Sequence, residues 1–176
     1  ATATNSNTNV SMLGESFKYA APLAGTLGFS VQDTAQALGL MANAGIKASN
    51  AGTSTRSWLT RMAKPTKESA TAMKDLKLSM TDSHGKMKSL NEIMQETRNS
   101  FNGLTKTEKT RYAAMLAGKQ GMSGLLAIVN ASEQDYKKLA KAIDTSSGAA
   151  DKMSKVKLDN LEGASEDAHD AHNEHY

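Results

Sequence analysis

The sequence predicts a mainly α-helical fold, a compact domain of about seven to nine short helices with one small β-hairpin near residues 78–88. The 176 residues contain only two prolines, which break helices, and ten methionines, which favour them. Few Val and Ile residues remain to build strands. Cysteine is absent, which excludes disulfide scaffolds, thiolate zinc sites and cysteine nucleophiles.

The chain divides by composition into four parts. Residues 1–10 are polar and aperiodic, so we expect a flexible segment, with the first helix beginning near Ser11. Residues 11–148 have helical periodicity and are expected to form the core. Residues 149–163 are expected to form a C-terminal helix, and residues 164–176 an acidic, His-rich tail that is disordered.

Helix starts are marked by a Ser or Thr that is followed three residues later by an acidic residue, the pattern of a capping box. Four such pairs occur: Ser30 with Asp33, Ser89 with Glu92, Thr105 with Glu108, and Ser132 with Asp135. Ser49 or Asn50 is a further candidate cap. The apolar stretch 122–129 fits a buried helix or a buried strand, and its helical flanks favour a helix.

Glycine and proline mark where the predicted helices end. Gly45 stands at the position after a helix where a residue in the left-handed conformation commonly ends it. Gly52 is expected to allow two helices to approach closely. Pro65 should separate two helices, and Pro22 should interrupt the first. Gly85 belongs to a turn between the strands of the expected hairpin, 78–81 and 86–88.

No motif carries recognisable catalytic chemistry. His169, His172 and His175 recur every third residue, but a metal centre needs further organised ligands, so we expect none. The glycines of 118–124 resemble a phosphate loop only superficially, because Gln120 follows Lys119 where Ser or Thr is required. The sequence therefore predicts neither an enzyme nor a cofactor.

Three residues are candidates for contact with a partner: Arg56, Trp58 and Arg61. Trp58 is the only tryptophan, and a core position is favoured over a docking role. Residues 56–119 hold thirteen Lys and Arg against six Asp and Glu. A solvated basic face is the default interpretation of this excess, with weak contact to a polyanion such as DNA as the alternative.

One run of sequence is more specific than these motifs. It comprises Ala-Asn-Ala-Gly-Ile-Lys-Ala-Ser at 42–49, Ala-Gly-Thr at 51–53 and Ala-Lys-Pro at 63–65. Phe-Lys-Tyr-Ala-Ala-Pro at 17–22 precedes it, and Asp82, Gly85, Lys86, Ser89 and Leu90 follow. In order and spacing this resembles the core of phage tail tape measure proteins over about residues 11–161. That core normally has more sequence before it, and the resemblance ends after Gly163, so we expect a piece of a longer chain.

The resemblance implies a noncatalytic structural domain of a protein that sets tail length during assembly. Such a protein occupies the tail tube near the distal tip in a few copies and is released at DNA ejection. The implied partners are tube, distal tail or baseplate hub proteins and tail assembly chaperones, in the virion tail and, during assembly, the host cytoplasm. The alternative is a tail-delivered module that contacts a membrane or cell wall to aid genome entry, with transient contact to DNA or the host membrane.

Overall fold

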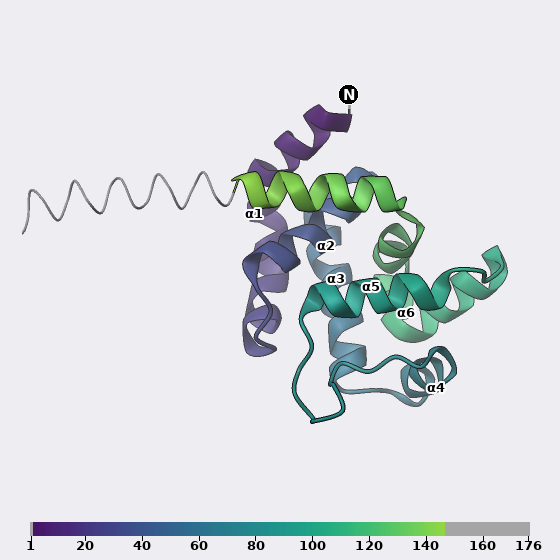
Figure 1. Cartoon of the computed structure of the whole chain (residues 1–176). Helices are drawn as coiled ribbons and strands as arrows, with labels where there is room; N and C mark the ends of the chain where they lie inside the picture. Colours follow the sequence, from purple (N-terminus) through teal and green to yellow (C-terminus); the bar gives the residue numbers. More distant parts are fainter. Residues whose placement is uncertain (1, 147–176) are drawn as a thin grey trace, which may run out of the picture.

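The computed structural model describes residues 2–146 of the chain, and the predicted segments 149–163 and 164–176 lie outside this range. The described part is helical, as predicted (Figure 1). Its helices are α1 (Thr2–Thr26), α2 (Val31–Asn43), α3 (Ala48–Ala63), α4 (Lys67–Leu76), α5 (Leu90–Phe101) and α6 (Lys106–Asn130). A last helical segment spans residues 133–146.

Helix α3 lies at the centre of the packing, with its most extensive contacts to α6 and α1. Trp58 and Leu59 of α3 are fully buried, as is Phe101 of α5. The core also receives buried side chains from every other helix, including the last segment through Leu139. Burial of large apolar side chains against one central helix is the main term that stabilises such a fold.

Most helices begin at the capping residues that the sequence predicted. The side chains of Ser30, Ser89 and Thr105 each accept a hydrogen bond from the backbone N–H three residues on, as the capping boxes predicted. Ser132 does the same for the last segment. The stretch 122–129 is part of α6 and is therefore helical.

Three helix boundaries differ from the sequence analysis. Helix α1 begins at Thr2 rather than near Ser11. Residues 2–10 are mostly Thr, Asn and Ser, which favour helices only weakly, but no Gly or Pro interrupts them. The same helix continues past Pro22 to Thr26, since one proline removes a single backbone hydrogen bond. Helix α3 begins after Lys47, which supplies no side-chain cap, so Ser49 and Asn50 lie inside the helix.

The predicted β-hairpin is absent from the described residues. Thr81 and Met87 form one isolated antiparallel bridge, and no strand extends from it. The predicted turn is present, because the Asp82 side chain accepts the N–H groups of His84 and Lys86 and closes it. The arms on either side of it are too short to form stable strands of their own. These backbone hydrogen bonds, that of Lys86 first, lower the pKa of the Asp82 carboxyl.

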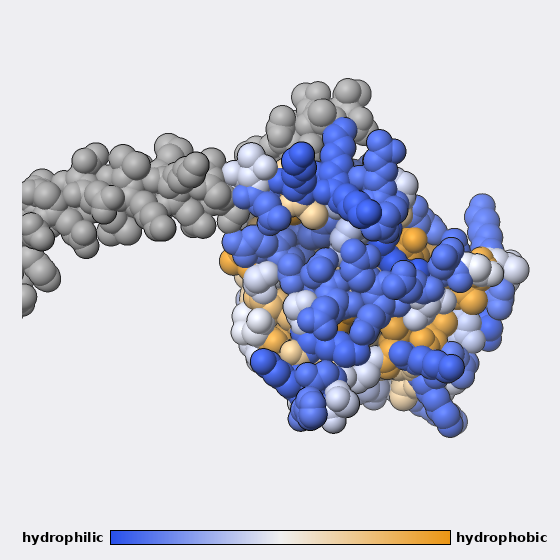
Figure 2. Space-filling view, viewed as in Figure 1, coloured by the Kyte–Doolittle hydropathy of each residue, from blue (hydrophilic) through white to orange (hydrophobic). Residues whose placement is uncertain are grey.

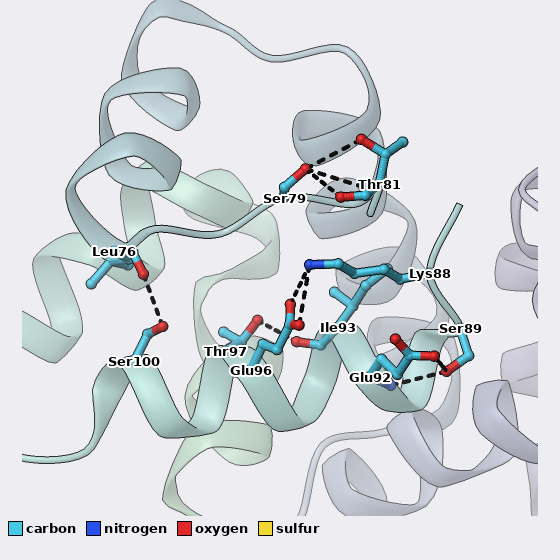
Figure 3. Close-up of polar contacts among 10 residues, drawn as sticks. All are labelled: Leu76, Ser79, Thr81, Lys88, Ser89, Glu92, Ile93, Glu96, Thr97 and Ser100. Atoms are coloured by element: carbon cyan, nitrogen blue, oxygen red, sulfur yellow. Dashed lines mark hydrogen bonds and ion pairs between the residues drawn. The ribbon is translucent and has the colours of Figure 1, made fainter. Parts of the chain in front are cut away.

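Side-chain contacts to α5 help to hold the segment between α4 and α5. Lys88 pairs with Glu96 at 2.8 Å, and Ser100 donates to the carbonyl of Leu76 at 2.9 Å (Figure 3). Ser79 bonds to Thr81 within the segment. Two backbone hydrogen bonds, Asp82 N–H to the Lys86 carbonyl and Lys88 N–H to the Met80 carbonyl, also join its two arms. The segment is thus ordered by this short pairing together with tertiary contacts.

Candidate functional site: the joint between α3 and α6

The contact between α3 and α6 is built around a break in α6. Gly118 has φ 73° and ψ 176°, so two helical halves meet there within Lys106–Asn130. Such dihedral angles are essentially restricted to glycine. A break of this kind leaves the carbonyl groups of the preceding turn without their helical donors.

Polar side chains of α3 bond to those carbonyls. Ser57 Oγ donates to the carbonyl of Ala117 at 2.7 Å, and Arg61 Nη2 to that of Met115 at 3.2 Å. Ser54 Oγ donates to the carbonyl of Gln120 at 2.8 Å, beyond the break. Residues 54, 57 and 61 share one face of α3, so a single helix face supplies all three donors.

Glycines bring the helix backbones together on two faces of α3. A Cβ at Gly52 would lie 2.5 Å from the carbonyl oxygen of Ser16 in α1. A Cβ at Gly124 of α6 would lie 2.7 Å from Cβ of Ser54. No side chain fits at either distance, so both positions require glycine.

The other predicted packing residues lie at turns. Gly45 has φ 88°, and the N–H groups of Gly45 and Ile46 bond to the carbonyls of Ala42 and Met41, which is a Schellman motif. Gly85 has φ 78° in the turn closed by Asp82. Pro65 lies between α3 and α4, although Thr66 rather than Pro65 caps α4.

The three candidate contact residues have different environments. Trp58 is 0% exposed, so its indole packs in the core and is not available to a partner in this fold. Arg61 bonds to Met115 and forms a 3.6 Å ion pair with Glu68. Arg56 is exposed beside a shallow pocket of about 240 Å³ between α3 and Gln120 of α6, and it remains a candidate contact.

A second polar joint, which the sequence analysis missed, connects α5 to the end of α6. Arg98 is 9% exposed and donates to the carbonyls of Ile128 at 2.7 Å and Ala131 at 2.8 Å. It also pairs with Glu133 and lies 4.6 Å from the ring centroid of Tyr136. The only sequence signal was an arginine on the apolar side of a helix.

The buried environment of Tyr136 also shifts its ionisation. Burial raises the pKa of the Tyr136 phenol to about 12, against the opposing effect of the Arg98 charge. The phenol donates to Asn91 Oδ1 at 2.6 Å. These groups join the last segment to α5 and show no arrangement of nucleophile and base.

Open pockets lie between α2, α3 and α6, one of about 440 Å³ whose lining includes Leu40, Ile46 and Leu126. The face in Figure 2 is predominantly hydrophilic, with scattered apolar side chains. Within residues 2–146 no helix is long and apolar enough to cross a membrane. The same residues include no cluster of three His, Cys, Asp or Glu side chains that could hold a metal ion.

These features define a helical structural module whose buried polar side chains hold helices together. The chain belongs to the phage-related minor tail protein family, which it matches over residues 1–118. It is 39% identical to the tape measure protein of Pneumococcus phage Dp-1 over 159 residues, which is 90% of this chain and 14% of that relative. It is 30% identical to the probable tape measure protein of Escherichia phage P2 over 154 residues, 86% of this chain and 19% of that relative.

The chain therefore corresponds to less than a fifth of the length of either relative. No solved structure matches it. The family and the relatives agree with the resemblance found in the sequence.

Proposed function

We propose that this chain is a noncatalytic, folded domain of a tape measure protein that sets tail length during phage tail assembly. The identity of 39% over nearly the whole chain to a tape measure protein carries this proposal. The fold supports it, because the side chains of Ser57, Arg61 and Arg98 bond to carbonyl groups of neighbouring helices. A domain of this kind contributes shape and packing rather than chemistry.

In the assembled particle the parent protein occupies the tail tube near the distal tip in a few copies and leaves it at DNA ejection. Its partners are tube, distal tail or hub proteins and the assembly chaperones. Arg56 is the candidate contact residue on this domain, because it is exposed and lines a pocket. Trp58 has no part in these contacts while the domain stays folded.

Mass spectrometry of purified particles tests the tail role. Peptides from residues 13–146, found at low copy number within a far longer polypeptide, would support it. Their absence from particles would overturn it. Leakage of liposomes or release of peptidoglycan by the purified chain would instead favour the module that aids genome entry.

A deletion experiment tests how much this domain contributes to tail length. An unbroken helix of 176 residues would span about 260 Å at about 1.5 Å per residue. If the domain is stretched along the tube, an in-frame deletion of it should shorten tails by about that length. If it stays folded, the shortening measured by electron microscopy should be several-fold smaller, and unchanged tails would exclude a length-setting role for this domain.

A further inference from the structure

Helix α6 contains one residue that interrupts an otherwise regular helix. In the 25 residues of Lys106–Asn130 only Gly118 has non-helical dihedral angles. No proline stands at the break, so nothing in the local sequence forbids helical geometry there. The break must therefore be stabilised by something outside α6.

Helix α3 supplies that stabilisation. Ser57 and Arg61 donate to carbonyls of Ala117 and Met115, which an unbroken helix would satisfy with its own N–H groups. The Arg61 side chain also lies in the break, since a Cβ at Gly118 would be 3.2 Å from its Cδ. Both interactions exist only while α6 is kinked and α3 is in place.

A straight α6 would keep part of its buried surface on one face. Projected at about 100° per residue, five buried residues from both halves fall within about 80° of one another. They are Ala113, Ala117, Gly121, Gly124 and Ile128. The other three buried residues, Leu116, Leu125 and Val129, lie outside this arc and widen it to about 220°. A straight α6 would therefore keep mainly its small residues on one face.

We propose that Gly118 makes α6 a two-state element, kinked while α3 is docked on it and straight as one continuous helix when α3 withdraws. The kinked state depends on contacts between helices, and the straight state needs only hydrogen bonds within α6. This equilibrium is a property of the isolated chain. If the experiment below disproves it, the proposed role in the phage tail is unaffected.

Distance measurements between spin labels on the full 176-residue chain test the proposal. The chain has no cysteine, so label sites can be introduced at the exposed residues Thr110 and Asn130 without side reactions. A straight α6 places their Cα atoms about 30 Å apart, because they are separated by 20 residues. The kinked helix gives a shorter separation, which should predominate in the unmodified sequence.

Gly118→Ala is the first variant, because alanine tolerates the kinked dihedral angles poorly and the helical ones well. We expect the ratio of straight to kinked molecules to rise roughly tenfold or more. Gly14→Ala is the matched control: it lies in α1, and its Cβ would have nothing within 4 Å. It should leave the distance distribution unchanged.

A double variant, Ser57→Ala with Arg61→Ala, removes the contribution of α3 and leaves Gly118 intact. It should also increase the population near 30 Å, and labels at Thr60 and Thr110 should move apart in the same samples. If either variant retains its helical circular dichroism and shows only the short separation, the proposal is wrong. A broad distribution with loss of helical signal would also overturn it, because α6 would then unfold rather than straighten.

Discussion

Replacing Arg98 with methionine should destabilise the fold more than any single charge change on the surface. The guanidinium of Arg98 donates to the carbonyls of Ile128 and Ala131 and pairs with Glu133 at 3.3 Å. It also lies over the Tyr136 ring at 4.6 Å. Methionine has a similar length but leaves both carbonyls at the end of α6 without this donor.

The magnitude follows from these contacts. Two hydrogen bonds from a charged donor contribute about 1.5–3 kcal/mol each, and the contact with the ring about 0.5–2 kcal/mol. The gain is offset because the guanidinium is desolvated, and its Nε is buried without a partner. A net loss of about 3 kcal/mol in the free energy of unfolding is expected, which lowers Tm by roughly 6–12 °C for a chain of this length.

The change in Tm is measured by thermal unfolding monitored by circular dichroism, with Arg111→Met as the matched control. Arg111 also lies 4.6 Å from a tyrosine ring, that of Tyr112, but it is exposed. Loss of the Arg111 side chain should lower the free energy of unfolding by no more than about 0.5 kcal/mol. If Arg98→Met melts within about 2 °C of the unmodified chain, the inferred contribution of this joint is wrong.

Three further predictions concern packing, backbone conformation and pH. Gly52→Ala should cost about 1–3 kcal/mol in denaturant unfolding because its Cβ would meet the backbone of Ser16 at 2.5 Å, while an unchanged midpoint would refute this close approach. Lys77→Gly should stabilise by about 1 kcal/mol, because Lys77 has φ 56° and glycine removes that strain; a lower Tm would contradict this explanation. The raised pKa of Tyr136 means that its stabilising effect is complete below pH 10 and is lost as the pH rises towards about 12. Unfolding titrations should show this loss in the unmodified chain, and Tyr136→Phe should reduce it; identical pH profiles would count against it.

Local sequence signals were enough to predict where four of the helical segments begin. Ser30, Ser89 and Thr105 cap helices, and Gly45 ends one, as their positions predicted. These signals act over at most a few residues, so tertiary structure has little opportunity to override them. The order of motifs also identified the family, because motif order is a property of the sequence alone.

The β-hairpin prediction was wrong, because the local sequence signal for strands in this segment was weak. The turn at Asp82 and Gly85 is present, but its flanks form one bridge and not two strands. A short strand pair has little stability of its own, so contacts with α5 decide the course of this segment.

The tertiary structure alone decided which polar side chains hold the helices together. The sequence already favoured a core position for Trp58, but it did not indicate that Arg61 would bond to a carbonyl at the break in α6. The partners of Arg61 and Arg98 lie 54 and 30 to 33 residues away along the chain. No periodicity within one helix encodes contacts at that separation, because they arise only when the buried faces of different helices meet.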